Sequence, residues 1–536
     1  MKQILYPWQE ECLKKWFANN CRGMVQAVTG SGKTLLALTA AERLRKTLPQ
    51  KLRVKIVVPT SALMRQWYRA LKHYLADADE TAPMQSFSVS GQDSAARISE
   101  HAVSGQKIGL RGAGCKSPAD CPYMIYVINS ARYELARQIL ADLKDGAAVL
   151  LIADECHRYE SEQNRLIFEF LPYIDPYKDR FFSLGLSATL PFGQAQNYLA
   201  SVLGRKIYHY GIKQAASMQT ICKYDIYHIS LSFLPEERHA YLEMTEQMNY
   251  LFGILLRTHP FLKGMSVKET YDLLRLLAGD KNEKTARTAS TYMKLSFKRK
   301  SLVCLASARI SCACELIERL PSSEKILIFG ERIRQAEELY ARLQTQYPGK
   351  AARYHSQMGQ FANKNALDCF RNGSARILIA CKAIDEGLDV PDASTGIILS
   401  GTSVQRQRIQ RLGRILRKAD GKERASLYYL HLADTTEDRC FLPETGENHM
   451  MDLEYFQDTR KFSNPPYDRA AEKLLKDLRL AGADEKTLIE AGRCLRLGSV
   501  RSDWLSARDD LNEKIRNAKY VSDKNYWICM KKLQDL

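Results

Sequence analysis

Short apolar runs alternate with amphipathic stretches in two separate parts of the chain. In the first part, between about residues 22 and 215, strands are predicted near residues 24–27, 54–58, 123–128, 149–153 and 181–186. In the second part, between about residues 320 and 435, they are predicted near residues 326–329, 376–380, 396–399 and 427–430. Strands that alternate with helices are typical of parallel sheets covered by helices. The pattern therefore predicts an α/β fold with two parallel-sheet domains in tandem.

Other segments lack this alternation. Residues 234–320 show no strand signal and are predicted to be helical, with a basic triplet at 298–300 that is either a phosphate-contacting surface or a solvated helix face. The last hundred residues are charged and also predicted to be helical, whereas the polar residues 86–120 predict a surface insertion. We therefore expect three domains, which are residues 1–220, residues 221–438 with a helical insertion at about 234–320, and a helical accessory domain at 439–536.

The composition is that of a folded protein with a strongly basic surface. With 536 residues, the chain is too long for a single hydrophobic core. Its net charge of +18 favours a polyanionic partner, and nucleic acid is the leading candidate. The 14 cysteines include no Cys-x-x-Cys pair, so reduced thiols and a cytoplasmic location are expected. No apolar run approaches a membrane span and no leader pattern begins the sequence, so we expect neither a membrane partner nor export.

A glycine-rich segment at residues 27–34, with the sequence AVTGSGKT, predicts a phosphate-binding loop. It lies between a predicted strand and a predicted helix, as such a loop requires, although the strict pattern has glycine in place of Ala27. The glycines allow backbone N–H groups to surround an anion, and the helix N-terminus adds partial positive charge. Lys33 is expected to reach the β- and γ-phosphates and the Thr34 hydroxyl to bind Mg²⁺. The predicted nucleotide-binding residues of this segment are Thr29, Gly30, Ser31, Gly32, Lys33 and Thr34.

An acidic pair, Asp154 and Glu155, follows the apolar run at residues 149–153 and precedes Cys156 and His157. Such a pair at a strand end suits two tasks in a phosphate-loop protein. Asp154 is expected to hold Mg²⁺, and Glu155 to orient and deprotonate the attacking water. An acidic pair after a strand is also common as a helix cap, but the preceding phosphate-binding loop favours the catalytic interpretation.

Together with other segments in the same order, these motifs resemble those of the superfamily 2 helicases and translocases. Residues 5–9 resemble the family's upstream adenine-reading element, with Gln9 as its amide. Residues 59–63, followed by Gln-Trp at 66–67, resemble its first nucleic-acid-contacting motif. The Ser-Ala-Thr at 187–189 matches the motif that couples the ATP state to the nucleic-acid site. The resemblance implies two RecA-like domains and the use of ATP and Mg²⁺.

The second part of the chain carries the remaining family motifs. Residues 383–391 resemble motif five, and residues 410–417 match motif six. In the family, two arginines of motif six reach across the interdomain cleft to the γ-phosphate, where a fixed guanidinium charge stabilises the transition state. Lys33 and Glu155 are the first-domain catalytic residues in this scheme. The residues of the second part that the resemblance assigns to the nucleotide or to catalysis are Gly387, Asp389, Gln410, Arg414 and Arg417.

Details of these motifs favour one branch of the family. The Asp-Glu-Cys-His at 154–157, the Gln-Trp at 66–67, and Gln410 before Arg411 resemble XPB-type DNA translocases and restriction-enzyme motor subunits rather than the DEAD-box RNA helicases. The resemblance therefore favours movement on double-stranded DNA. An RNA helicase, a nucleic-acid-sensing ATPase switch without translocation, and a motor subunit with a nuclease or other defence or repair partner remain alternatives, and the oligomeric state is left open.

Overall fold

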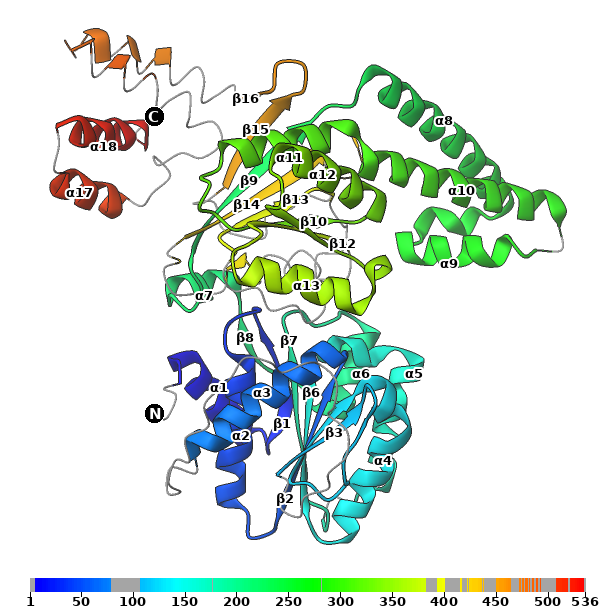
Figure 1. Ribbon diagram of the computed structural model, residues 1–536. Coiled ribbons are helices and arrows are strands. Elements are labelled where there is room, and N and C mark those ends of the chain that lie inside the picture. The colour runs from blue at the N-terminus through cyan, green and yellow to red at the C-terminus, as the bar shows by residue number, and fades with distance from the viewer. Residues whose placement is uncertain are drawn as a thin grey trace. The chain divides into compact units, whose positions relative to one another are not determined.

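The computed structural model describes residues 5–78, 107–175, 177–280, 282–381, 393–400, 415–416, 422, 424–435, 437, 450–463, 508–518 and 521–534, with scattered residues between 472 and 492. The chain divides into two compact units. Among the described residues, unit 1 contains those up to Lys223 together with residues 415, 416 and 422, and unit 2 contains the remainder. Each unit is built on an eight-stranded sheet (Figure 1).

The sheet of unit 1 is parallel apart from one hairpin at its edge. Its strand order is β4-β3-β5-β2-β6-β7-β1-β8, in which β3 and β4 form the antiparallel pair. The strands are β1 (Arg22–Ala27), β2 (Leu52–Val58), β3 (Ile108–Gly112), β4 (Cys115–Lys116), β5 (Tyr123–Val127), β6 (Ala148–Asp154), β7 (Phe181–Ser187) and β8 (Lys206–Tyr210). Strands β5 and β6 are buried along their whole length, as expected for parallel strands covered on both faces. Because parallel strands end at the same edge, the segments that follow β1, β2, β6 and β7 share one edge of the sheet.

Helices cover both faces of the unit 1 sheet. Buried residues of α4 and α6, including Leu135 and Leu199, pack against strand residues such as Leu151. Helices α2 and α3 lie on the opposite side (Figure 1). The helices are α1 (Pro7–Ala18), α2 (Lys33–Thr47), α3 (Ser61–Ala78), α4 (Ile128–Lys144), α5 (Glu162–Arg165), α6 (Gln194–Leu203) and α7 (Ile212–Ser217), with 3₁₀ turns at Cys156–Glu160, Leu166–Phe168 and Leu171–Tyr173.

The sheet of unit 2 has the order β11-β12-β10-β13-β14-β9-β15-β16. Its central pairs β10–β12 and β10–β13 are parallel, and β15–β16 is antiparallel. The strands are β9 (Lys223–Leu231), β10 (Ile326–Gly330), β11 (Ala351–Tyr354), β12 (Ile377–Cys381), β13 (Thr395–Ile398), β14 (Arg424–Leu432), β15 (Met450–Phe456) and β16 (Lys461–Ser463). The apolar strands β10 and β12 are buried throughout, so they form the middle of this unit.

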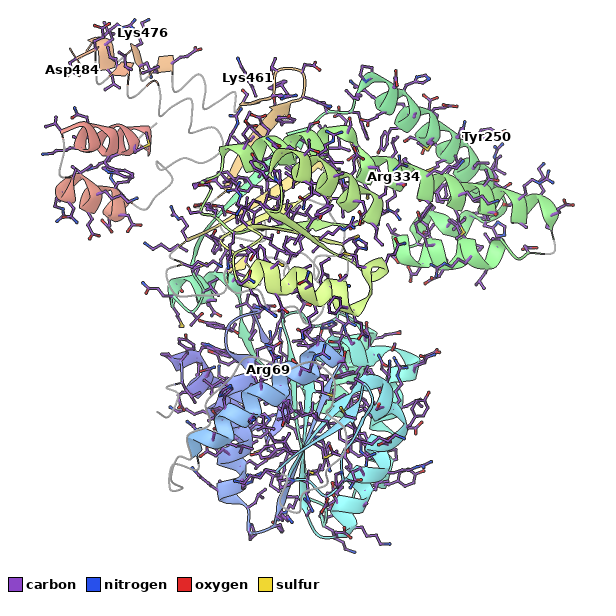
Figure 2. All side chains as sticks on the ribbon, viewed as in Figure 1. Arg69, Tyr250, Arg334, Lys461, Lys476 and Asp484 are labelled. Carbon is purple, nitrogen blue, oxygen red and sulfur yellow. The ribbon has the colours of Figure 1, made fainter. Side chains whose placement is uncertain are left out.

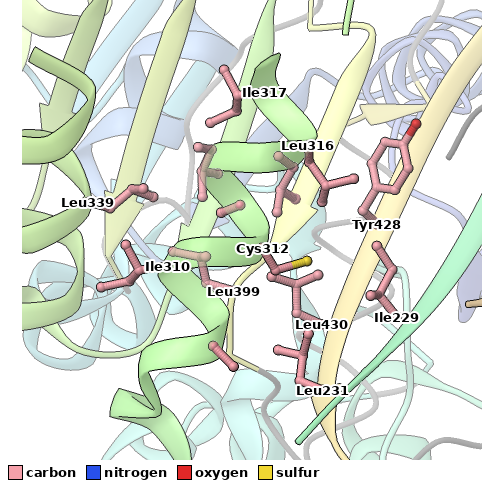
Figure 3. Close-up of a cluster of buried hydrophobic side chains, with 14 of the residues drawn as sticks. Ile229, Leu231, Ile310, Cys312, Leu316, Ile317, Leu339, Leu399, Tyr428 and Leu430 are labelled. Carbon is pink, nitrogen blue, oxygen red and sulfur yellow. The ribbon is translucent and has the colours of Figure 1, made fainter. Parts of the chain in front are cut away.

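The main core of unit 2 lies between its sheet and two helices, α11 (Ser307–Arg319) and α12 (Ile333–Gln346). Figure 3 shows this core, in which Leu316 of α11 lies on the side of Leu430 of β14. Ile310, also on α11, lies on the side of Leu339 of α12. Helix α13 (Gly359–Arg371) covers the other face, and a 3₁₀ turn at Ser356–Met358 precedes it (Figure 1). The sheet is therefore enclosed on both sides, as parallel sheets require.

A helical segment of unit 2 comes before α11. It consists of α8 (Pro235–Thr258), a 3₁₀ turn (Pro260–Gly264), α9 (Val267–Leu277) and α10 (Glu283–Leu305). The three helices enclose a small core of their own that contains Leu255, Leu274 and Leu277. The exposed Tyr250 on α8 marks the outer surface of this segment in Figure 2. Near the C-terminus, α17 (Arg508–Asn517) and α18 (Val521–Gln534) are joined by the ammonium of Lys514, which lies 4.2 Å from the centre of the Trp527 ring.

Several strands at or near the sheet edges differ from the sequence-based expectation. The segment at 86–120, expected to be a surface insertion, contributes β3 and β4, and β3 pairs with the buried strand β5. The last hundred residues, expected to be helical, contribute β15 and β16. In β15, Leu453 and Tyr455 are buried while Glu454 between them is exposed, so the strand has a two-residue period that its charged positions obscure. The expected domain boundaries remain a prediction.

The basic triplet at 298–300 lies in α10 and is not a uniform charged surface. Arg299 donates a hydrogen bond to the Thr245 hydroxyl at 3.1 Å, and its guanidinium lies 5.5 Å from the centre of the Tyr241 ring. Lys300 lies 3.9 Å from Glu331. Arg299 is half-buried by these contacts, whereas Lys298 and Lys300 are exposed. No helix in the described part of the chain is long and apolar enough to cross a membrane.

Candidate functional site

The glycine-rich segment forms a tight loop between β1 and α2. The Ser31 hydroxyl donates to the carbonyl oxygen of Val28 at 2.7 Å, and the Ser31 N–H points to the same oxygen at 3.3 Å. Gly30 and Gly32 have φ values of +89° and +92°, which few other residues adopt. The ammonium of Lys33, the first residue of α2, donates to the carbonyl oxygen of Ala27 at 2.9 Å. The lysine thus lies across the mouth of the loop.

The side chain of Gln9 supports this loop through a hydrogen bond to its backbone. Gln9 is fully buried in α1, and its Nε2 donates to the carbonyl oxygen of Gly32 at 3.0 Å. Its Oε1 accepts a hydrogen bond from the backbone N–H of Tyr6 at 2.8 Å. A Cβ on residue 32 would lie 2.8 Å from the Gln9 Nε2, so a larger residue there would displace the Gln9 amide. Both ends of the amide are engaged by protein, and Gln9 therefore acts here as a brace for the loop.

The loop also presents polar groups suited to a phosphate and its metal ion. The Thr29 hydroxyl is buried and makes no hydrogen bond within the described structure. Thr34 is half-buried in the first turn of α2, where backbone N–H groups are directed out of the helix end. A buried hydroxyl in need of a partner, a helix N-terminus and the Lys33 ammonium together fit an anionic phosphate group.

Asp154 is the last residue of β6, and two N–H groups fix its carboxylate. The indole N–H of Trp67 donates to Oδ2 at 2.8 Å, and the backbone N–H of Glu155 donates to Oδ1 at 3.0 Å. Burial, and next the adjacent Glu155 charge, raise the pKa of Asp154 to about 6, while Trp67 and the Lys33 ammonium act in the opposite direction. A buried carboxylate whose charged form is disfavoured gains from a nearby cation, which fits the expected Mg²⁺ ligand.

Glu155 begins the turn after β6 in the left-handed conformation, with φ of +48°. Its Oε2 lies 3.3 Å from Nδ1 of His157, which is 2.8 Å from the Ser187 hydroxyl. The Ser187 hydroxyl in turn donates to the carbonyl oxygen of Thr189 at 2.6 Å. The acidic pair is therefore linked through His157 to the Ser-Ala-Thr segment after β7.

The sheet brings these two predicted groups of residues together. Strand β7 pairs with both β1 and β6, so the loop after β1 and the acidic pair after β6 emerge two strands apart at one edge. The ammonium of Lys33 is near enough to Asp154 to favour its ionised form. The other predicted site residues lie outside the described part of the chain, and they are Gly387, Asp389, Gln410, Arg414 and Arg417.

Two residues near the acidic pair have roles that the sequence does not reveal. Trp67 was expected beside nucleic acid, but it is only 1% exposed and bonds to Asp154. Tyr159 is fully buried, and its hydroxyl lies 2.7 Å from the carbonyl oxygen of Asp154 and 2.9 Å from that of Val57. The spacing of Met64, Trp67 and Leu71 along α3 is that of a buried helix face and indicates the burial of Trp67, though not its partner.

Two family models match the chain in the order of its two units. Residues 2–192 match the model described as "Type III restriction enzyme, res subunit". Residues 308–419 match the model described as "Helicase conserved C-terminal domain".

Individual proteins agree with these matches. The chain is 27% identical over 419 residues to "DNA 3'-5' translocase XPB2" of Sulfurisphaera tokodaii, covering 78% of this chain and 79% of that protein. It is 26% identical over 231 residues to "UvrABC system protein B" of Synechococcus elongatus, covering 41% of this chain and 34% of that protein. Among solved structures, a variant of S. cerevisiae Dbp5 bound to RNA and ADP BeF3 aligns with a TM-score of 0.51 and 12% identity, covering 84% of this chain and 90% of that one. This last likeness establishes the fold, two RecA-like domains in tandem.

Proposed function

We propose that this chain, which belongs to the superfamily 2 helicases, is an ATP-driven motor that moves along double-stranded DNA. The observation that carries the proposal is the convergence of the phosphate-binding loop and the acidic pair at one edge of the unit 1 sheet. The preference for DNA is supported by the similarity to the XPB2 translocase, which extends over 78% of the chain.

Unit 1 supplies the groups that hold and hydrolyse the nucleotide in this proposal. Lys33 and the backbone of the glycine loop hold the phosphates, and Gln9 keeps the loop in shape. Thr34 and Asp154 would hold Mg²⁺, which would supply positive charge to neutralise charge that develops on the phosphate oxygens. Glu155 accepts a proton from the attacking water, and its position is set by the turn that follows β6.

The second part of the chain completes the machinery by resemblance to the family. Gly387 and Asp389 of motif five are assigned to the nucleotide, and Gln410, Arg414 and Arg417 of motif six to catalysis. A guanidinium is always charged and presents a planar fork to phosphate oxygens, so Arg414 and Arg417 suit the stabilisation of a phosphoryl transition state. If the two arginines approach the nucleotide only when ATP is bound, each round of ATP binding and hydrolysis would drive one conformational cycle.

The nucleic acid is proposed to contact the edge of the unit 1 sheet where α3 begins. Residues Thr60 and Ser61 stand there, and the Thr60 hydroxyl accepts a hydrogen bond from the N–H of Leu63 at 3.3 Å. Hydroxyls and N–H groups at a helix N-terminus are common phosphate contacts, and they carry no base specificity. With a net charge of +18, the affinity should fall steeply as salt rises.

The test is ATP hydrolysis by the purified protein with duplex DNA, single-stranded DNA or duplex RNA at matched salt. We expect slow hydrolysis alone and strong stimulation by duplex DNA, at least equal to that by RNA. The Glu155→Gln variant, purified in parallel, measures any contaminating ATPase because its own turnover should be abolished. Stimulation by RNA only would overturn the assignment to DNA. A hydrolysis rate that no nucleic acid changes would overturn the proposal that the chain is a nucleic-acid motor.

A second candidate role is that of a motor subunit that works with a nuclease. It is favoured by the match of residues 2–192 to the res-subunit model of type III restriction enzymes. Affinity purification of the full chain from its native cells, followed by mass spectrometry, tests this role. A nuclease or methylase recovered in fixed ratio would support the subunit role, whereas a chain recovered without such a protein would favour an independent motor.

A further inference from the structure

The bond between Trp67 and Asp154 connects two parts of unit 1 that are 87 residues apart in the sequence. Trp67 lies in the second turn of α3, the helix that begins at the proposed nucleic-acid contact. Asp154 ends β6 and is proposed to hold Mg²⁺. An indole N–H is a donor only, so it can hold a carboxylate oxygen but cannot exchange roles with it. Since both partners are buried, water does not compete for this bond.

Tyr159 makes a second connection between the same two segments. Its hydroxyl lies within hydrogen-bonding distance of the carbonyl oxygens of Asp154 and Val57. Val57 is the second-last residue of β2, only a few residues before α3 begins. The segment that leaves β2 and the turn that leaves β6 are thus joined twice, once through the Asp154 side chain and once through its backbone.

The two oxygens of Asp154 are held by donors of different kinds. The N–H of Glu155 belongs to the next residue of the chain, so it moves together with the backbone of Asp154. Trp67 belongs to a separate helix, so of these two bonds it is the one that ties the carboxylate to another element of the unit. Without the indole, the carboxylate could rotate about its side-chain torsions, and the oxygen that faces the metal would no longer be defined.

We propose that Trp67 is a positioning residue, whose indole N–H orients the Asp154 carboxylate toward Mg²⁺ and ties that orientation to the helix that begins at the nucleic-acid contact. The inference rests on the proposed function, because it takes Asp154 as the metal ligand. Outer partners of metal ligands typically change metal affinity by about 10- to 100-fold when they are removed. The same change is expected here.

Trp16 provides a matched control within the same unit. It is also 1% exposed, and its indole N–H donates to the backbone carbonyl oxygen of Ser183 at 3.0 Å. That carbonyl belongs to β7 and cannot rotate independently of the sheet. Replacing either tryptophan with phenylalanine therefore removes one buried N–H donor and a similar volume, but only Trp67→Phe frees a proposed metal ligand.

The experiment measures Mn²⁺ binding by electron paramagnetic resonance in the presence of a non-hydrolysable ATP analogue, together with the thermal midpoint of each variant. Trp67→Phe and Trp16→Phe should lose comparable stability, while only Trp67→Phe should bind Mn²⁺ about 10- to 100-fold more weakly. Nucleotide affinity without metal should stay near the wild-type value in both. Equal Mn²⁺ affinity in the two variants would overturn the inference.

Two further measurements separate this inference from the proposed function. If Asp154→Asn binds Mn²⁺ as tightly as the wild type, the metal-ligand assignment itself is wrong; if it loses Mn²⁺ while Trp67→Phe does not, only the positioning role fails. Should Trp67→Phe not fold, the wild-type chain labelled with ¹⁵N-tryptophan serves instead. Adding Mg²⁺ to the analogue-bound protein should then shift a buried indole N–H resonance that is neither that of Trp16 nor that of the equally buried Trp8, which are identified with Trp16→Phe and Trp8→Phe. The absence of such a shift would contradict the proposal.

Discussion

Replacing Gly32 with alanine tests how closely the phosphate-binding loop is built against its support. Gly32 has φ of +92°, a left-handed conformation that costs other residues about 1–2 kcal/mol. An added Cβ would lie 2.8 Å from the Nε2 of Gln9, which is bonded at both ends of its amide and fully buried. Gln9 would have to move, and its hydrogen bond to the Gly32 carbonyl would be lost.

The conformational cost of about 1–2 kcal/mol adds to the cost of the lost hydrogen bond, which is about 1 kcal/mol. The total is about 2–3 kcal/mol. If the variant loop keeps its native conformation, this cost appears as reduced stability. If the loop relaxes, the native conformation must be restored when ATP binds, and the cost appears as reduced affinity. The whole cost in affinity would correspond to about 30- to 150-fold weaker binding. We therefore expect the sum of the two losses to reach about 2–3 kcal/mol.

The assay combines denaturant unfolding with titration of a fluorescent ATP analogue, and Gly114→Ala is the control. Gly114 has φ of +85° in the β3–β4 turn, but a Cβ there would meet nothing within 4 Å. Gly114→Ala should lose only the conformational cost of about 1–2 kcal/mol in stability and bind ATP normally. The reasoning is refuted if Gly32→Ala matches the wild type in both measurements, or if Gly114→Ala impairs ATP binding equally.

Three further predictions concern the same site. Glu155→Gln should bind ATP and Mg²⁺ without hydrolysing ATP, whereas Lys33→Ala should weaken nucleotide binding. Equilibrium binding and steady-state ATPase assays distinguish these two effects, and wild-type binding and hydrolysis in both variants would disprove the assignment of the nucleotide site. Arg414→Ala and Arg417→Ala should each lower turnover at saturating ATP and DNA by about 10³-fold with little loss of ATP affinity, and near-normal turnover in both would make these arginines structural. Burial raises the pKa of Asp154 to about 6, so without metal the folded protein binds the Asp154 proton more tightly than the unfolded chain does. Protonation of Asp154 therefore stabilises the fold at pH 4, and this stabilisation should be lost as the pH rises through about 6. The thermal midpoint of the wild type should thus fall relative to that of Asp154→Asn across this range, and a constant difference would contradict the raised pKa.

The sequence predicts best those features that a short segment determines by itself. The glycine loop and the strand-ending acidic pair are each encoded within a few residues, and their approach follows from parallel strands that end at a common edge. The central strands are predicted for the same reason, because fully buried strands are continuous apolar runs. Strand β15, next to the edge strand β16, buries only alternate residues, and the charged residues between them hide the strand pattern in the sequence.

Contacts between distant segments could not be predicted. Nothing near residue 67 indicates that its indole meets Asp154, since the pairing exists only once β2, β6 and α3 are in place. Gln9 was assigned to adenine by resemblance, and the structure adds its bond to the Gly32 carbonyl. Arg299 was grouped with two lysines by sequence proximity, but the ring of Tyr241 and the hydroxyl of Thr245, both from α8, hold it.

Displacement of a third strand from a DNA triplex tests the central claim most directly, because it requires movement along intact duplex DNA rather than ATP hydrolysis alone. A linear duplex carrying a labelled triplex-forming strand is incubated with the protein and ATP, with Glu155→Gln and a non-hydrolysable analogue as controls. An ATP-driven duplex motor should release the labelled strand, and neither control should do so. Duplex-stimulated ATP hydrolysis with the triplex left intact would contradict translocation and identify the chain as a nucleic-acid-sensing switch.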